Sequence, residues 1–349
     1  MNPAPLRIEP IFSPRIWGAR SLAPLYPDKT DLTEPLGEAW LTGVQCRIAS
    51  WPFRGKSLGE AWSEMPAEWR GTRFATGGGF PLLAKFIFPT EKLSIQVHPD
   101  DAYASAHEKA MGGQGKTEMW HIFSAEPNAQ LLLGLKPGVG QQQFLRGLET
   151  HTLESLFQAH VVQTGDTIFV PAGSPHTIGT GMIVFEVQQY SDLTYRVYDY
   201  GRVDSNGKPR ELHLEKALAV TNFGGTAGGR TSPLPLPAEE GDRWLLAACR
   251  YFATERREAT DPFTVEMDAA HFDLIVPLSG EGILRTHDFA FPFGPGECWF
   301  LPANLGEYHV QPIKGMATLI RTYVPDLVRL RSELKGAGHA KSADRTVFD

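Results

Sequence analysis

The stretch LSIQVHPDD, residues 93–101, carries two potential ligand side chains, Gln96 and His98, two positions apart. In an extended chain successive side chains point to opposite faces, so these two polar groups share one face and the aliphatic residues of the stretch share the other. An ordinary surface strand shows the same alternation. A functional assignment of this strand therefore needs support from other parts of the chain.

Two further segments supply groups of the same kind. In GKTEMW, Lys116 and Glu118 again lie two apart on one strand face, and in GDTIFVPAGSPH, His176 follows a Pro-Gly turn at a strand end. Two imidazoles, a carboxylate and an amide oxygen form a mixed nitrogen and oxygen donor set, which suits zinc with a position open for water or substrate. The pattern predicts a metal site of catalytic type that includes Gln96 and His98.

Each of these residues also has a purely structural interpretation. A single His98 or His176 is more often a hydrogen-bonded structural histidine than a ligand, whereas the two together with Glu118 favour a site. Glu118 could pair only with Lys116, but residues two apart on one strand face can both face a shared ligand. His121 falls on the opposite strand face from Glu118 and is excluded, and the other eight histidines lack ligand spacing.

Short apolar runs between Gly and Pro residues are the elements that must position these groups. PLLAKFIF, LSIQVHP, TEMWHIF, DTIFVPA and MIVFEVQQY have the length and punctuation of strands in a sandwich or barrel. Helical spacing is rarer. It occurs in GVGQQQFLRGLETHTLESLFQAH, with a break near 149–151, in AYASAHEKA after a capping Asp100 or Asp101, and in ELHLEKALAVT.

The chain of 349 residues is long enough for two compact units. Residues 224–241 concentrate Gly and Pro and predict an exposed connection between a unit over 1–223 and a second over 242–325. Residues 326–349 predict a tail with a short helix and a loose end. GDTIFVPAGSPHTI and GECWFLPANLGEYHV share several positions, so the two units are expected to be β-barrels of the same kind.

Composition excludes several classes of partner. A formal net charge of -7 argues against nucleic acid or an anionic membrane as a partner, and an anionic ligand would need a local cationic pocket. Three widely spaced cysteines form no disulfide or metal-knuckle pattern, which predicts a reducing, cytoplasmic location. No stretch approaches the ~20 apolar residues of a membrane span. The oligomeric state is not encoded in any of these features.

Several ordered blocks resemble one enzyme family. Gly165, Pro171, Gly173 and His176 match the second motif of the cupin family, G-x5-P-x-G-x2-H. LSIQVHPDD, GKTEMWHI, GDTIFVPAGSPHTIG and YSDLTYRVYDYGR, taken in this order, resemble the blocks of type I mannose-6-phosphate isomerases in their short bacterial form. RIWGAR and LGEAWLTG near the N-terminus are similar to that family too. Four blocks in one order are far more specific than a single cupin motif.

The resemblance implies a fold and a set of site residues. The fold would be mainly β, with two cupin-like jelly-roll β-barrels and a few short helices, the first barrel catalytic and the second degenerate. It implies one zinc ion per chain at Gln96, His98, Glu118 and His176, although in short members the glutamine is not always counted as a ligand. Arg196 matches the family's catalytic arginine, and Lys116 and Glu186 match positions lining its sugar-phosphate pocket.

The activity implied is the interconversion of mannose 6-phosphate and fructose 6-phosphate through an enediol. Glu186 is the expected general base, Arg196 and the metal would stabilise the enolate oxygen, and Ser94 lies where it could meet the substrate. Lys116, Lys85 or Arg196 would hold the phosphate. Glu186 could equally be an outward residue of an alternating strand, and Arg196 a salt-bridge former near acidic neighbours in its own block.

Two other functions share the same ligand set. A cupin barrel does not by itself specify the chemistry, so the site could hold iron or manganese in an oxygen-using dioxygenase. A non-enzymatic sugar-phosphate-binding cupin is the second alternative. The YSDLTYRVYDYGR block and the nearby lysine and arginine residues argue against a dioxygenase. The partner expected from the sequence is therefore a small-molecule sugar phosphate.

Overall fold

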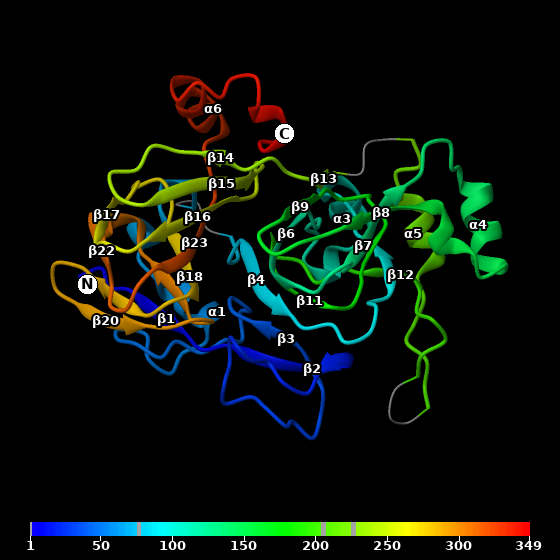
Figure 1. Cartoon of the computed structure of the whole chain (residues 1–349), viewed down its shortest axis with the longest axis horizontal. Coiled ribbons are helices and arrows are strands. Elements are labelled where there is room, and N and C mark those ends of the chain that lie inside the picture. The colour runs from blue at the N-terminus through cyan, green and yellow to red at the C-terminus, as the bar shows by residue number, and fades with distance from the viewer. Residues whose placement is uncertain (1, 75–77, 204–206, 225–227) are drawn as a thin grey trace.

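The computed structural model describes residues 2–74, 78–203, 207–224 and 228–349, which fold into two β-rich units side by side (Figure 1). In the first unit a seven-stranded sheet and a five-stranded sheet face each other across an apolar core. The larger sheet has the order β13 (Gly229–Arg230), β9 (Thr167–Val170), β6 (Glu118–Ala125), β11 (Met182–Gln189), β4 (Leu82–Ile87), β3 (Leu36–Trp40), β2 (Ile11–Ala19). The smaller has the order β12 (Tyr195–Tyr198), β5 (Ile95–Val97), β10 (His176–Ile178), β7 (Gln130–Leu135), β8 (Phe157–Val161).

The second unit repeats this plan with a seven-stranded and a four-stranded sheet. Its larger sheet has the order β1 (Leu6–Ile8), β21 (Cys298–Leu301), β18 (Asp273–Ser279), β23 (Ala317–Tyr323), β16 (Ala253–Ala259), β15 (Asp242–Ala248), β14 (Leu234–Pro235). The smaller has the order β17 (Phe263–Glu266), β22 (Glu307–Pro312), β19 (Gly282–Arg285), β20 (Ala290–Phe293). The internal repeat is visible here, because Gly165 and Gly296 both have positive φ and each precedes a strand, β9 or β21.

Helices are short and lie around the sheets. They are α1 (Leu58–Glu64), α2 (Ala67–Arg70), α3 (Asp101–His107), α4 (Gln141–Glu149), α5 (Leu214–Val220) and α6 (Leu327–Gly336), with 3₁₀ turns at Thr72–Phe74, Lys109–Met111, Leu153–Leu156, Ala303–Leu305 and Ala343–Arg345. The three helices expected in the first unit are confirmed. Asp100 caps α3 by accepting a hydrogen bond from the Tyr103 amide at 2.8 Å, and α4 ends at the predicted break. Within the described residues no helix is long and apolar enough to cross a membrane.

The two units share packing. Strand β1 lies in the larger sheet of the second unit, where Leu6 pairs with Phe300. The Trp62 ring of α1 lies 5.5 Å from Phe272 and 6.4 Å from Phe300, and one continuous apolar cluster contains residues of both units. The division into residues 1–223 and 242–325 stays a prediction, since the early chain contributes to both cores.

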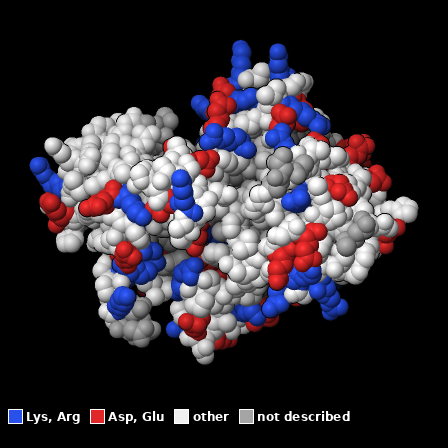
Figure 2. Space-filling model, turned by 180° about the vertical axis from the view of Figure 1, so that it is seen from behind, with Lys and Arg blue, Asp and Glu red and all other residues white. Residues whose placement is uncertain are grey.

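The ends of the second unit differ from expectation. The tail predicted to be loose is packed, because Val347 is buried and the Phe348 ring stacks on Phe169 with 3.9 Å between centroids. In the connection over 224–241, Leu234 and Leu236 are buried, since alternate residues of an extended Leu-Pro-Leu segment share one face; residues 225–227 lie outside the described part. Acidic and basic side chains are interleaved over the rear face of the molecule (Figure 2).

Candidate active site

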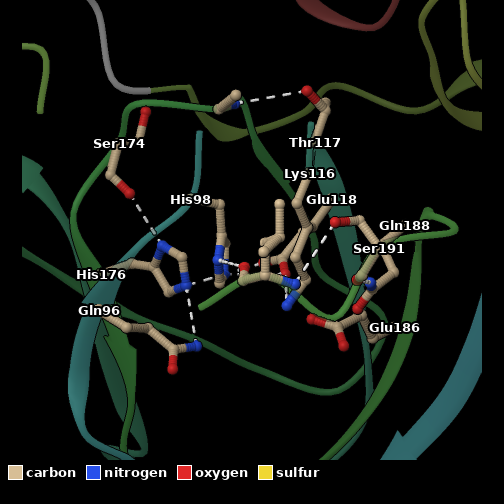
Figure 3. Close-up of polar contacts among 12 residues, drawn as sticks. Gln96, His98, Lys116, Thr117, Glu118, Ser174, His176, Glu186, Gln188 and Ser191 are labelled. Atoms are coloured by element: carbon tan, nitrogen blue, oxygen red, sulfur yellow. Dashed lines mark hydrogen bonds and ion pairs between the residues drawn. The ribbon is translucent and has the colours of Figure 1, made fainter. Parts of the chain in front are cut away.

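Three strands of the first unit bring the predicted metal ligands together. Gln96 on β5 lies directly opposite His176 on β10 in the antiparallel register, His98 follows β5, and Glu118 begins β6 of the facing sheet. Figure 3 shows the side chains of His98, Glu118 and His176 pointing toward one another. One ligand atom from each of these three residues lies within 4.8 Å of the others, and all three side chains are buried.

The distances within the cluster are those of groups arranged around a shared ion. His98 Nε2 lies 3.2 Å from Glu118 Oε1, and His176 Nε2 lies 3.7 Å from Glu118 Oε2. His98 Nε2 and both Glu118 oxygens are fully buried and have no hydrogen-bond partner, although Lys116 Nζ lies 2.8 Å from Glu118 Oε1 as an ion pair. Buried polar atoms are rarely left unsatisfied, so these atoms indicate a site for a cation.

Backbone carbonyls set the orientation of both imidazoles. His98 Nδ1 donates to the Leu193 carbonyl at 2.7 Å, and His176 Nδ1 donates to the Ser174 carbonyl at 2.9 Å. A carbonyl oxygen can only accept, so each Nδ1 carries the hydrogen and each Nε2 keeps its lone pair free for a metal. Burial lowers the pKa of His98 to about 3 and also lowers the pKa of His176, so both rings are neutral near pH 7.

Glu118 and Gln96 complete the donor set. Burial alone would raise the pKa of Glu118, but the positive charge of Lys116 and the interactions with His98 and His176 outweigh burial and hold this pKa well below its usual range. Gln96 Nε2 lies 3.3 Å from His176 Nε2. Turning the amide end for end exchanges its nitrogen and oxygen, so Gln96 stands where it can offer an oxygen to the same cation. The residues present therefore fit the zinc ion that the resemblance implies.

A cavity of about 510 Å³ lies against this cluster. Gln96 and Lys116 line the cavity, whereas His98, Glu118 and His176 do not, and the space is large enough for a sugar phosphate. The lining also includes the predicted catalytic and substrate-binding residues Ser94, Lys85, Glu186 and Arg196. Glu186 is thus a buried residue facing the cavity, and the alternative of an outward side chain does not hold.

Along one wall of the cavity runs a chain of buried charges. Lys85 Nζ lies 3.2 Å from Glu38 Oε1 and 2.8 Å from Glu186 Oε2, and Trp120 Nε1 donates to Glu186 Oε1 at 2.7 Å. The strand register imposes this order, because Lys85 and Trp120 flank Glu186 on the two neighbouring strands. Burial and the nearby Glu118 charge raise the pKa of Glu186 despite the lysine.

Lys85 was predicted as a possible phosphate ligand, and the structure places its ammonium between two carboxylates. Burial would lower the pKa of Lys85, but Glu186 and Glu38 outweigh it and raise this pKa, so the lysine stays charged. Burial likewise opposes ionisation of Glu38, yet Lys85 and Arg15 lower its pKa to about 2. Its two carboxylate contacts leave Lys85 less free to meet a phosphate than Arg196, which has no carboxylate partner within the described residues.

The cavity lining includes three arginines. They are Arg15, Arg196 and Arg210, and among them Arg196 has no carboxylate partner in the described part of the chain. Arg196 Nη1 donates to the Glu211 carbonyl at 2.9 Å, whereas its Nε is buried without a partner. Burial, followed by repulsion from Arg210, lowers the pKa of Arg196. This is the local positive site that an anionic ligand of a net negative chain requires.

Sequence reasoning missed several residues of this cavity. Arg15 and Glu38 lie in the RIWGAR and LGEAWLTG blocks, whose resemblance to the family assigns neither residue to the site. Trp120 lies two residues after Glu118 on the same strand face, so the alternation that identified Glu118 would also have found it. Arg210 had no local signal, because it lies outside the strands.

Two facing sheets around a buried cluster of two histidines and a glutamate are typical of the cupin class, and the cluster is a possible metal site. Comparison with known proteins gives the family. The phosphomannose isomerase type I catalytic domain matches residues 6–121, and the mannose-6-phosphate isomerase cupin domain matches residues 244–324.

Individual relatives are similar in sequence to this chain over most of its length. The mannose-6-phosphate isomerase ManA of Bacillus subtilis is 32% identical over 89% of this chain and 97% of its own length. The mannose-6-phosphate isomerase of Streptococcus mutans is 29% identical over 86% of this chain and 93% of its own length. The crystal structure of the mannose 6-phosphate isomerase from Bacillus subtilis has a TM-score of 0.82 at 30% identity and covers 91% of this chain and 99% of that one.

The chain belongs to the type I mannose-6-phosphate isomerase family. The predicted family, enzyme class and mainly β cupin fold are confirmed.

Proposed function

We propose that this chain interconverts mannose 6-phosphate and fructose 6-phosphate through an enediol, and that it depends on one zinc ion held by Gln96, His98, Glu118 and His176. The observation that carries the proposal is the buried cluster with unpartnered ligand atoms, beside a cavity whose lining includes three arginines. A bound divalent ion would supply Lewis acidity toward the sugar oxygens.

The phosphate belongs beside two arginines of the cavity lining. Arg15 and Arg210 line this region, and guanidinium groups bind phosphate oxygens in a bidentate manner. Arg15 and Arg210 hold Glu38 and Asp199 as well, so they are oriented before the substrate arrives. With the phosphate beside these arginines, the other end of the sugar, with C1 and C2, extends toward Gln96 and Lys116.

Glu186 is the proposed general base. It removes the proton from C2 and returns it to C1, and a pKa raised by burial lets a carboxylate do both near neutral pH. Lys85 and Trp120 each hold one of its oxygens, which orients the carboxylate. Arg196, whose backbone pairs with that of Gln96, is proposed to stabilise the negative charge that develops on the enediol oxygen.

The decisive experiment measures fructose 6-phosphate formation from mannose 6-phosphate on the purified protein, after chelation, and after zinc is restored. We expect activity to disappear on chelation and to return with zinc. A folded, zinc-loaded protein without isomerase activity would overturn the proposal. Oxygen uptake by the same samples would instead support the dioxygenase alternative, and tight sugar-phosphate binding without turnover would support a binding protein.

A further inference from the structure

The second unit encloses a cavity of its own, of about 630 Å³, between its two sheets. Its lining comes from alternate residues of the strands, such as Glu255 and Arg257 on β16 and Leu319, Arg321 and Tyr323 on β23, because alternate side chains share the interior face. Residues of α6 form part of the border, and Figure 1 shows this helix near β14 and β15 at the top of the unit. The catalytic proposal makes no use of this space.

One side of the cavity is built from buried ion pairs. Arg243 donates to both oxygens of Glu255, at 2.8 Å each, and Arg321 donates to both oxygens of Asp273, at 2.6 and 3.1 Å. The Tyr323 hydroxyl donates to Glu255 at 2.9 Å. Bidentate pairs of this kind hold both members in one geometry. These charged groups therefore form a fixed polar wall, in which the carboxylates of Glu255 and Asp273 are both already paired.

Arg257 takes no part in these ion pairs. Its guanidinium stacks on the Phe263 ring at 3.9 Å and donates to the Glu240 carbonyl at 3.1 Å. Its Nε is buried with no partner, and within the described residues no carboxylate lies at ion-pairing distance. Burial, with repulsion from Arg243, lowers the pKa of Arg257. The site thus holds a cation in surroundings that favour an added anion.

The Tyr308 hydroxyl is a second group of this cavity that lacks a hydrogen-bond partner among the described residues. The Tyr308 side chain is only 1% exposed. Burial raises the pKa of Tyr308 well above its usual range, and Asp273, Arg321, Glu255 and Arg257 are the charges that act on it. Tyr308 lines the same cavity as the charged wall, and its hydroxyl can donate to an acceptor there.

The lining as a whole is net acidic, with four arginines against six carboxylates, and only its inner wall has an excess of one cation when the Asp273 partner of Arg321 is counted. Arg243, Arg257 and Arg321 contribute three positive charges, against two negative charges from Glu255 and Asp273. At the border, Asp268 already pairs with Arg329 at 2.7 Å. Glu239, Glu266, Asp326 and Glu333 also line the border, on its solvent-exposed side.

The remaining wall is apolar. Phe263, Ile275, Val310 and Leu319 line the cavity and belong to one buried cluster. A hydrated inorganic ion would meet this surface poorly, whereas an organic anion would bury an apolar body against it. The ligand expected from this wall carries one anionic group and a compact apolar part.

We propose that the second unit is a binding site for a small organic anion whose carboxylate or phosphate accepts hydrogen bonds from Arg257 and Tyr308 and whose apolar part lies against the Phe263 wall. This site is separate from the candidate active site, and binding to it is measured without turnover. A negative result for the isomerase proposal would not affect this binding proposal, and a negative binding result would not affect the isomerase proposal.

The test titrates the full, zinc-loaded chain with benzoate, phenyl phosphate and neutral benzyl alcohol in a calorimeter. We expect an anionic probe to bind once per chain with a dissociation constant of about 1 mM or tighter, and benzyl alcohol to bind at least about tenfold more weakly. A preference for benzoate or for phenyl phosphate tells a carboxylate site from a phosphate site. No binding of either anion up to about 10 mM would overturn the proposal.

Substitutions locate the bound probe. Arg257→Gln and Tyr308→Phe should each weaken binding by about tenfold, since each removes a donor to the anion. Arg285→Gln is the matched control, because Arg285 is exposed on the outside of the same unit and should leave binding unchanged. Tyr308→Phe keeps the packing of the ring, so it can test the site if the Arg257→Gln variant does not fold. Binding that Arg196→Gln abolishes and Arg257→Gln retains would place the probe in the first cavity and refute the inference.

Discussion

At the scale of single residues, the pKa of each carboxylate in the candidate active site depends on the groups that it contacts. Glu118 faces two histidines and a lysine and is ionised, whereas Glu186 is buried against Trp120 and Lys85 and keeps a raised pKa. Two carboxylates in one cavity can thereby take different roles, one as a ligand and one as a base. Arg196 differs from its neighbours because it has no acidic partner to share its charge within the described residues.

Arg196→Ala tests which end of the sugar this arginine meets. If it stabilises the enediol oxygen, kcat should fall by about 100-fold or more with little change in KM, as expected for an interaction made only in the transition state. The measurement is steady-state kinetics with mannose 6-phosphate. A large rise in KM with kcat retained would assign Arg196 to the phosphate instead. Arg202→Ala is the matched control, because Arg202 belongs to the same block and pairs with Asp199 outside the cavity lining.

Glu38→Gln tests the buried charge chain through the pH dependence of stability. The folded-state pKa of Glu38 is about 2, below the ordinary 4.5, so its ionised form stabilises the fold above about pH 4.5 and this stabilisation is lost as pH falls toward 2. We expect the variant to lose about 3 kcal/mol of unfolding free energy at pH 7. Urea unfolding at several pH values should show the difference from the parent shrinking below pH 4.5; a constant difference would contradict the assignment.

At the scale of elements, turns hold the short ligand strands in place. Gly173 has a φ of 81°, and its amide donates to the His98 carbonyl at 2.8 Å while its own carbonyl accepts from Asn222. The turn before His176 is thus tied both to the end of the strand that carries His98 and to the end of α5. A side chain at Gly173 would place its Cβ 3.0 Å from the Val220 carbonyl oxygen.

Gly173→Ala should weaken the metal site as well as the fold. An L-residue in the left-handed region costs about 1–2 kcal/mol, and the resulting shift would misplace His176, so we expect about tenfold weaker zinc affinity. Gly138→Ala is the matched control, since Gly138 has a φ of 83° and open space around its Cβ position. Zinc titration should distinguish the two variants, and equal zinc affinity in both would show that this turn does not position the ligand.

At the scale of the whole molecule, the two units are joined through α1 rather than only through their connection. Trp62 is 3% exposed and packs on Phe74 and Phe80 of the early chain and on Phe272 and Phe300 of the second unit. Together with the pairing of β1 and β21, this makes the N-terminal segment part of both hydrophobic cores. We therefore expect the units to unfold together.

Trp62→Ala should lower the unfolding free energy by about 3–5 kcal/mol, the usual loss for a large buried aromatic side chain. In scanning calorimetry the single transition should move to lower temperature as one peak. Trp51→Ala is the control, because Trp51 is 57% exposed and should cost less than about 1 kcal/mol. Two separate peaks, of which only one moves, would show that the units are energetically independent.

The sequence by itself determined much of the site. Period-two spacing placed Gln96 with His98 and Lys116 with Glu118, and a Pro-Gly turn marked His176, because these patterns depend on local backbone geometry. The order of the blocks then indicated the family, the cupin fold and the positions of Glu186 and Arg196.

Tertiary structure decided the rest, because which strand faces reach one another depends on register between distant segments. Local alternation could not show that Lys85 lies between Glu38 and Glu186, or that Arg15 and Arg210 line one cavity. Nor could it show that, among the described residues, Arg257 has no carboxylate partner and the Tyr308 hydroxyl has no hydrogen bond. Such arrangements arise only when strands far apart in the chain pair and bury their charges together.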